Sequence, residues 1–450
     1  MIESTALRRH ILILAGLALA LRLTFVILGL QTQDLAAFSA AAPDSTTYMS
    51  VAEYILTGEG PGSRYLFISG PGYPLILVVL RLVFGAGWAA PVVLNILFGV
   101  CAPVVIYLIA LRLLGRASIA LLAGLIVAVS TTGTSMSTSV ITDQPFYTLH
   151  ALALLLFLQG LHTQKSRWFV GAGLMAGCAT YVRALGQTWP LIFVCMALLI
   201  LYRPGRATDW ALFRRSLWTP TILLVMILGW SSVMYARYDV FTFSSNGISA
   251  AWAYLAARAV ADHNEEMSIE DVRAQWAEES REYFAGRQPT QAESYHWIRA
   301  HLAGTFRSHP GWMFTTYIDV IRSNVQVPNH YPSIQVPQMQ RLWRPMTSVA
   351  EHWFNGLLFW LSIAGLGLLV ARRQRMAWAV TGLTFAYFTA ITGFSYWQGS
   401  RLHFPAEMAW SILLAYLVVV TFEYANQMRG RSMLRPGRKR AEPPATISGV

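Results

Sequence analysis

Charged residues are scarce in this sequence. Asp, Glu, Lys and Arg together make up 12% of its 450 residues, whereas hydrophobic residues make up 55%. Because water-soluble domains carry about 25% charged residues, an ordinary soluble protein is excluded. In lipid, every backbone polar group must be bonded within its own segment, and helices meet this condition. The composition therefore predicts an all-α, polytopic membrane protein.

Cysteine and lysine are also rare. The cysteines, Cys101, Cys178 and Cys195, lie inside apolar runs, where we expect small core residues rather than a disulfide framework. Only Lys165 and Lys439 are lysines, so the net charge of +12 comes from arginine. The arginines fall mostly in short loops between apolar runs, which is a pattern of membrane topology. This distribution argues against a nucleic-acid partner.

Several motifs of soluble enzymes are missing. The sequence has no glycine-rich phosphate loop, no HExxH and no GxSxG, which argues against an ATPase, a zinc protease and a serine hydrolase. No histidine and carboxylate pair shows the spacing of metal ligands, so we predict no metal site. A divalent cation shared between an acidic residue and a phosphate oxygen is left open.

Long apolar runs predict about ten transmembrane helices. They cover residues 10–30, 88–110, 117–134, 145–161, 168–185, 187–202, 217–236, 353–371, 376–394 and 403–424. The run 73–84 is shorter and begins in a Pro/Gly turn, which is typical of an interfacial or re-entrant helix. When this run is not counted as a span, every arginine-rich short loop falls on one side. The positive-inside rule then predicts that both termini are cytoplasmic.

The predicted organisation has four parts. They are an N-terminal transmembrane module (1–236) with an acidic first outer loop (31–87), an extracytoplasmic helical segment (237–352), C-terminal transmembrane helices (353–424) and a basic cytoplasmic tail (425–450). Apolar periodicity within the extracytoplasmic segment predicts helices at about 268–284 and 291–307, and a third that runs to about 323.

The first outer loop contains the clearest candidate for a catalytic residue. Asp44 begins a predicted amphipathic helix that continues through Leu56 and ends in a glycine-rich turn at Gly58. A carboxylate at the boundary of lipid and water can serve as general base for a hydroxyl group. Asp is also a preferred helix cap. Both interpretations of Asp44 stay open on the sequence alone.

A second acid and several arginines share the outward side of the predicted topology. Asp143 stands two residues before Pro145, where it either caps a helix or supplies a second site carboxylate. Arg183 and Arg401 lie at the outward ends of spans, and Arg64 lies in the first outer loop. A guanidinium offers paired donors to a phosphate, although arginines at helix ends also reach ordinary headgroups. We take the three arginines as candidate phosphate ligands.

Aromatic residues accompany these charges. The outward set is Tyr48, Tyr65, Tyr73, Tyr396 and Trp397. Such rings could stack on a sugar, and an interfacial aromatic belt explains them at least as well. Tyr48 and Tyr73 are our candidates for substrate contacts.

The order of these motifs resembles the GT-C glycosyltransferases. Asp44 with Tyr48 four residues on, the Gly-Pro-Gly-Tyr-Pro run at 70–74, Asp143, and the basic residue Arg183 after a glycine-rich helix resemble the phospholipid-carrier-dependent group. That group includes relatives of the protein O-mannosyltransferases and the lipid A aminoarabinose transferases. The similarity covers roughly residues 1–205 well and the rest in layout only.

The resemblance implies an inverting transfer of a hexosyl or pentosyl group from a polyprenyl-phosphate donor to an acceptor hydroxyl. The acceptor would be a lipid, a glycan or a protein, and the site would face the periplasm from a bacterial inner membrane. Asp44 would be the base and Asp143 a secondary acid, while Arg183 and Arg401 would hold the lipid phosphate.

The sequence also departs from the family pattern. Asp44 is followed by Ser45, where the family often has a second acid, so the metal requirement and the acceptor class stay undetermined. A transporter or flippase of lipid-linked saccharide is the alternative function. A non-catalytic assembly subunit is a further alternative, and it would tolerate replacement of Asp44 by Asn.

Overall fold

The structure is a computed structural model, and it describes residues 4–40, 42–59, 62–202, 209–264, 266–326, 356–395 and 400–433. Within these ranges the chain forms helices and connecting turns, without a strand. The all-α, polytopic membrane fold predicted from composition is confirmed. The proline-rich stretch after 326, the residues Tyr396 and Trp397, and most of the basic tail lie outside the described residues.

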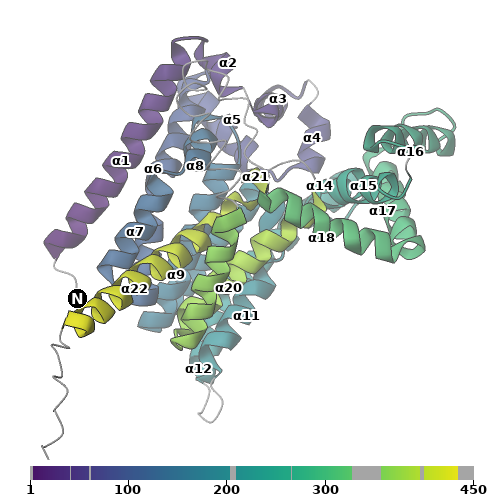
Figure 1. The fold of residues 1–450 in the computed structure, drawn as a ribbon. Helices are drawn as coiled ribbons and strands as arrows, with labels where there is room; N and C mark the ends of the chain where they lie inside the picture. Colours follow the sequence, from purple (N-terminus) through teal and green to yellow (C-terminus); the bar gives the residue numbers. More distant parts are fainter. Residues whose placement is uncertain are drawn as a thin grey trace, which may run out of the picture.

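Apolar helices of different lengths, together with the short hydroxyl-rich α8, make up the body of the molecule (Figure 1). They are α1 (Ser4–Leu30), α6 (Ala89–Leu114), α7 (Ala117–Ala128), α8 (Thr131–Thr138), α9 (Asp143–Thr163), α10 (Ser166–Val182), α11 (Trp189–Leu201), α13 (Trp218–Tyr238), the helix Gly356–Ala371, α20 (Arg375–Ala390) and α22 (Glu407–Met433). α1 begins and α22 ends at the same end of this bundle (Figure 1). This arrangement agrees with the prediction that both termini lie on one side.

The predicted count of ten spans is not confirmed. Six helices in the described chain are long and apolar enough to cross a membrane, or seven if α7 and α8 form one span bent by 51°. The other predicted spans fall on α10, α11 and Gly356–Ala371, each of which has fewer than 18 residues. The run 73–84 forms the helix α5 (Gly72–Phe84), which belongs to the shorter apolar class, as expected.

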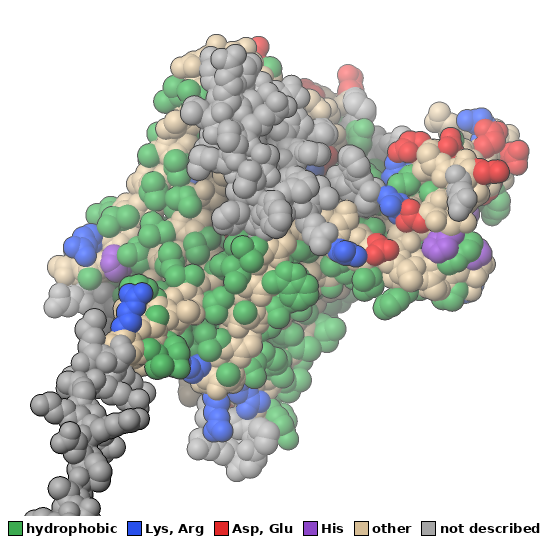
Figure 2. Space-filling model, in the orientation of Figure 1, with side chains coloured by type: hydrophobic (Ala, Val, Ile, Leu, Met, Phe, Trp, Pro, Cys, Tyr) green, Lys and Arg blue, Asp and Glu red, His purple; other side chains and the backbone are tan. Residues whose placement is uncertain are grey.

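Short helices gather at the end of the bundle opposite the termini (Figure 1). They include α2 (Leu35–Ser39), α3 (Pro43–Thr57), α4 (Gly62–Ile68) and α21 (Ser400–His403). The described chain also contains the short turns η1 (Ala184–Gly186), η4 (Ile391–Phe394) and η5 (Phe404–Ala406). The short helix α12 (Trp210–Ser216) lies at the other end. Figure 2 shows Lys and Arg side chains around that other end, as the positive-inside rule predicts.

A small helical lobe projects from the bundle on the side of α3 and α21 (Figure 1). Its elements are α14 (Asn246–Ala250), the π-helical turn η2 (Ala251–Ala256), α15 (Ala257–Ala261), α16 (Ile269–Tyr283), α17 (Gln291–Ser308) and α18 (Pro310–Gln326). The three predicted helices of this segment are found at α16, α17 and α18. Val272 and Trp276 of α16 are buried, whereas Tyr283 near the end of the same helix is 71% exposed.

Two local expectations are wrong. Between the predicted spans 117–134 and 145–161 we expect an outward turn at 132–144, but residues 131–138 form the helix α8. Ser130 caps this helix, and the hydroxyls of Thr134, Ser137 and Thr138 donate to carbonyls within the same segment. Hydroxyl-rich sequences favour turns in water, but an apolar surrounding favours internal pairing. The cysteines were expected in the core, whereas Cys101 and Cys178 are exposed on the outside of the bundle.

Candidate functional site

Four charged side chains that are far apart in the sequence form one chain of ion pairs at the α3 end of the bundle. Arg401 pairs with Asp44 and also contacts Asp143, with its Nε 3.2 Å from Oδ2 and 3.3 Å from Oδ1. Arg183 also pairs with Asp143, through its Nη1 and the Asp143 Oδ1. The order is therefore Asp44, Arg401, Asp143, Arg183, and the formal charges cancel. All four were candidates from the sequence, and the structure brings them together.

Asp44 is presented by the first turn of α3. The helix begins at Pro43, whose fixed φ suits a first helical position, and Ala42 occupies the cap position without a side-chain bond. Asp44 therefore does not cap the helix, and that interpretation is wrong. Its side chain is 42% exposed. Gly58 ends α3 in a left-handed conformation (φ 78°), as the sequence predicted.

Asp143 differs from Asp44 in being completely buried (0% exposed). It is the first residue of α9, and the cap position belongs to Thr142, which makes no side-chain cap bond. The capping interpretation is wrong here as well. Arg183 and Arg401 are 14% and 13% exposed. Burial of an ionised carboxylate is costly unless a positive charge pairs with it. Arg183 and Arg401 supply that charge for Asp143.

The segment 139–142 leads from α8 to Asp143. Asn95, a residue that the sequence analysis did not identify, holds this segment in place. Asn95, buried in α6, donates from Nδ2 to the carbonyls of Ser139 (2.6 Å) and Ile141 (3.1 Å). The hydroxyl of Tyr73 donates to the Asn95 Oδ1 at 3.3 Å. A lone amide inside the apolar run 88–110 was the available signal, because such groups are buried only with partners.

The Gly-Pro-Gly-Tyr-Pro run positions Arg183. Gly70 and Gly72 lie against the backbone of Tyr181, near the end of α10, so closely that a Cβ at Gly72 would be 2.7 Å from the Tyr181 carbonyl carbon. Only glycine permits that approach. Arg183, two residues after Tyr181, is the C-cap residue of α10 and has an extended backbone conformation. The motif therefore joins the start of α5 to the segment that presents a site arginine.

Tyr48 lies one helical turn after Asp44 and faces the site. Its hydroxyl is 3.3 Å from the Thr142 Oγ1, next to Asp143 in the chain, and its ring meets Tyr73 edge-on at 5.3 Å. Burial, together with the nearby Asp44 carboxylate, raises the pKa of Tyr48, so the phenol stays protonated. Tyr73 is buried (0% exposed), so its position fits support of the site better than stacking on a sugar.

Two other candidates can be placed only in part. Arg64 belongs to α4, but its side chain lies outside the described residues. Tyr65, the next residue, is partly buried. No group of three or more His, Cys, Asp or Glu side chains in the described chain is arranged to hold a metal ion.

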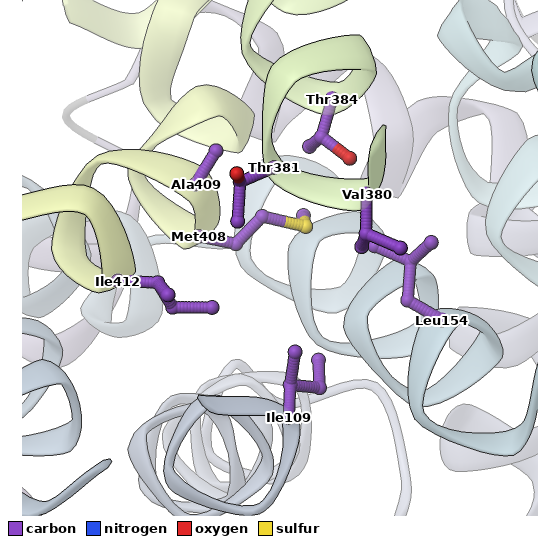
Figure 3. A pocket seen from close by; sticks show the side chains of 8 residues that line it. All are labelled: Ile109, Leu154, Val380, Thr381, Thr384, Met408, Ala409 and Ile412. Carbon is purple, nitrogen blue, oxygen red and sulfur yellow. The ribbon is translucent and has the colours of Figure 1, made fainter. Parts of the chain in front are cut away.

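A small, mostly apolar pocket lies between α6, α9, α20 and α22 (Figure 3). Its lining side chains are Ile109, Leu154, Val380, Thr381, Thr384, Met408, Ala409 and Ile412. None of them is charged, so the pocket itself offers no acid, base or phosphate ligand.

The sequence comparisons agree with the resemblance noted above. Residues 69–235 match the family described as dolichyl-phosphate-mannose-protein mannosyltransferase. This match confirms the predicted kinship with the GT-C superfamily of glycosyltransferases. It covers α5 through α13, and with them Asp143 and Arg183. No curated protein matches the sequence.

Solved structures with similar layouts are distant in sequence. The apo oligosaccharyltransferase from Archaeoglobus fulgidus aligns with 94% of this chain and 53% of its own, at 12% identity and a TM-score of 0.49. ArnT from Cupriavidus metallidurans bound to undecaprenyl phosphate aligns with 93% of this chain and 81% of its own, at 16% identity and a TM-score of 0.37. This chain spans about half the length of the oligosaccharyltransferase.

Proposed function

We propose that this protein is an inverting glycosyltransferase that takes a sugar from a polyprenyl-phosphate donor and transfers it to an acceptor hydroxyl. The observation that carries the proposal is the ion-pair chain of Asp44, Arg401, Asp143 and Arg183. It combines a half-exposed carboxylate with two partly buried guanidinium groups at one end of a membrane bundle. The family match over residues 69–235 supports the same class of reaction.

Each charge has a distinct role in the proposed reaction. The Asp44 carboxylate accepts the proton of the acceptor hydroxyl, whose oxygen attacks the anomeric carbon. The bond from that carbon to the phosphate oxygen breaks, and the lipid leaves as polyprenyl phosphate. Arg401 and Arg183 stabilise the negative charge that grows on the phosphate, an effect that is strong where water is excluded. The back-side attack inverts the anomeric configuration.

Asp143 and Tyr48 support these groups in the proposal. Asp143 contacts both arginines, so it fixes the distance between the two guanidinium groups. When a phosphate approaches, Arg401 exchanges part of its contact with Asp44 for phosphate oxygens, which frees the Asp44 carboxylate to act as base. The Tyr48 phenol, which shares a hydrogen bond with the Thr142 hydroxyl, donates to a substrate oxygen in the proposal.

We place the site on the periplasmic face of a bacterial inner membrane. The support is the cluster of basic residues at the opposite end of the bundle, which the positive-inside rule assigns to the cytoplasm (Figure 2). Lipid-linked donors on that face need no nucleotide-binding domain. The acceptor is a hydroxyl on a lipid, a glycan or a protein.

The direct experiment is sugar transfer by purified protein in lipid nanodiscs. Polyprenyl phosphates that carry labelled hexoses or pentoses are offered together with envelope extracts as acceptors. Release of polyprenyl phosphate with a labelled, configuration-inverted product supports the proposal. Movement of intact lipid-linked sugar across liposomes without bond cleavage would identify a flippase instead. The same assay with a chelator separates the proposed base mechanism from one that uses a divalent cation between Asp44 and the phosphate.

Identification of the natural sugar requires the cell. Mass spectrometry of the envelope after deletion of the gene names the sugar that is lost and the molecule that carried it. A deletion that leaves every envelope sugar unchanged would contradict the proposed function.

A further inference from the structure

One helix of the lobe, α18, contacts the outer end of the membrane helix α20. Figure 1 shows α18 running from the lobe to the bundle near α21, and it packs against both α21 and the turn η4. The hydroxyl of Tyr317 in α18 donates to the carbonyl of Ala390, the last residue of α20, at 2.6 Å. The lobe is therefore joined to the point where the chain leaves α20 and continues toward Arg401.

A second side chain of α18 holds the turn that follows. Asn324 is buried (1% exposed), and its Nδ2 donates to the carbonyls of Thr392 (2.9 Å) and Ser395 (2.8 Å). The Ser395 N–H also bonds to the Thr392 carbonyl at 3.2 Å, which closes the turn. Thr392 and Ser395 are buried as well, so water cannot readily replace the amide of Asn324. One side chain thus fixes the backbone six residues before Arg401.

The turn itself is shaped to receive α18. A Cβ at Gly393 of η4 would collide with the ring of Tyr317, so only glycine permits this approach. The same ring meets Phe394 edge-on, with the ring centroids 5.1 Å apart. Hydrogen bonds and ring packing from α18 therefore hold η4 together.

Asn324 repeats the arrangement that Asn95 makes elsewhere in the site. Asn95 donates from Nδ2 to two carbonyls of the segment that leads to Asp143. Asn324 does the same for the segment that precedes Arg401, which contacts both Asp44 and Asp143. In both cases a buried amide on another helix fixes the backbone before a charged residue of the site. Asn324 differs in that it belongs to the lobe.

We propose that Asn324 and Tyr317 are positioning residues for the transfer reaction: from the lobe, they hold the backbone at 390–395 so that Arg401 keeps its contacts with Asp44 and Asp143. They act through carbonyl groups and not on the substrate. Their effect on rate rests on the proposed function, whereas their effect on the geometry of this segment does not.

The first test compares Asn324→Asp with Asn246→Asp. A carboxylate has the shape of the amide but no N–H to donate, so N324D sets oxygen atoms against the two carbonyls. Asn246 is exposed on α14 of the same lobe, so N246D adds the same charge without that loss. We expect N324D to lower kcat by on the order of 10- to 100-fold, because small misplacements of reacting groups cost that much. N246D keeps the wild-type kcat.

A second comparison distinguishes positioning from a general loss of folded protein. A smaller folded fraction would multiply with the loss caused by Arg401→Lys, whereas misplacement of Arg401 costs little once that guanidinium is gone. We therefore expect N324D/R401K to be slower than R401K by less than about threefold. Donor KM should rise less than kcat falls, since Arg183 is still present. Multiplying losses, or N324D with the kcat of N246D, would overturn the proposal.

Tyr317→Phe replaces N324D if that variant does not fold. It removes the hydroxyl and keeps the ring against Gly393. We expect kcat to fall roughly 3- to 10-fold, as for the loss of one hydrogen bond. The matched control is Tyr283→Phe, because the side chain of Tyr283 is 71% exposed. A folded Y317F protein with the kcat of Y283F also overturns the proposal.

Hydrogen exchange provides a readout that needs no activity. We expect N324D, but not N246D, to speed exchange of backbone amides at 391–395 and 401–406. If the wild type transfers no sugar, the proposed function fails, and this exchange result still decides the positioning role. Unchanged exchange in both segments would reject it.

Discussion

Asp44 and Asp143 contact the same guanidinium, yet their surroundings differ. Asp44 is 42% exposed, whereas Asp143 is completely buried between Arg401 and Arg183. A half-exposed carboxylate can receive an incoming hydroxyl, while a buried one that is shared by two arginines cannot move without breaking both pairs. The two acids therefore differ in what their removal should do to the protein.

We predict that Asp143→Asn destabilises the protein and that Asp44→Asn does not. Loss of the Asp143 charge leaves two partly buried guanidinium groups short of a partner, at a cost on the order of 3–5 kcal/mol. Solvent compensates for the loss of Asp44, so its cost stays below about 1 kcal/mol. Thermal unfolding in detergent measures both variants. Equal midpoints for D143N and D44N would contradict the assigned division of roles.

Arg401→Lys gives a second test at this scale. Arg401 contacts both carboxylates, and a single ammonium cannot reproduce the paired, planar donors of a guanidinium. We expect kcat to fall by about 10²-fold, as for the loss of one group that stabilises developing charge. The control is Arg322→Lys, because Arg322 of α18 is exposed. This variant should keep the wild-type kcat. Wild-type kcat in R401K would remove the phosphate role.

The sequence predicted the four charges of the site but not their supporting residues. Asp44, Asp143, Arg183 and Arg401 are acids and arginines at the ends of apolar runs, where charge is informative. Asn95 donates to the carbonyls of another segment, and Ser130 caps α8 at the break after α7. Both roles depend on how the helices pack, so no local sequence pattern predicts them. The capping interpretation failed for both acids because Ala42 and Thr142 occupy the cap positions.

At the scale of helices, the approach of α5 to α10 determines where Arg183 lies. We predict that Gly72→Ala lowers stability by about 1–3 kcal/mol, because a Cβ 2.7 Å from the Tyr181 backbone forces a shift. It should also lower kcat, since Arg183 follows in the chain. Gly87→Ala is the matched control, because nothing lies within 4 Å of its Cβ. Equal stability and kcat in the two variants would rule out this close approach.

The start of α17 responds to acid. The Arg287 guanidinium and the backbone N–H of Thr290 donate hydrogen bonds to the Glu293 carboxylate. These bonds lower the pKa of Glu293 to about 2. A carboxylate whose folded pKa lies below its unfolded value stabilises the fold above the unfolded pKa, and the contribution is lost as the pH falls toward 2. Glu293→Gln should therefore reduce protection of amides at 291–294 at pH 5, and this difference should disappear near pH 2.

Hydrogen exchange, corrected for the intrinsic effect of pH, measures this difference. Glu270→Gln is the control, because Glu270 is 79% exposed and lies 3.9 Å from Arg273. Exchange that is identical in E293Q and the wild type at every pH would show that the capping box does not stabilise α17.

Helix positions in the lobe were predictable because their signals are local. α16 and α17 each begin with a capping box, at Ser268 and Thr290. The bend between α7 and α8 was not predictable, because it depends on Ser130 and on the buried partners around it. The exposure of Tyr283 has the same origin: periodicity gives a face, but packing decides how far along the helix that face is covered.

For the whole molecule, the predicted orientation has a direct test. In a variant without native cysteines, Cys at position 46 (Thr46→Cys), exposed on α3, should react with an impermeant maleimide added to the periplasmic side. Cys at position 164 (Gln164→Cys), exposed between α9 and α10, should react only after permeabilisation. The reverse pattern would place Asp44 in the cytoplasm and end the proposal of a periplasmic site.

Composition predicted the fold class, and charge distribution predicted which helix ends share a side. The number of spans was not predictable in the same way. A hydropathy run does not show where a helix breaks or how short a buried helix can be when its neighbours cover it. α10 and α11 are such cases, because both pack within the bundle and have fewer than 18 residues.

The most direct test of the proposed active site compares Asp44→Asn with Glu53→Gln in one assay. Both residues lie on α3, and Glu53 pairs with Arg81 away from the ion-pair chain. With a labelled polyprenyl-phosphate sugar that the wild type uses, D44N should bind the donor normally and transfer sugar at least about 10²-fold more slowly, the usual loss for a general base. E53Q should match the wild type. Transfer by D44N at the rate of E53Q would contradict the assignment of Asp44 as the base.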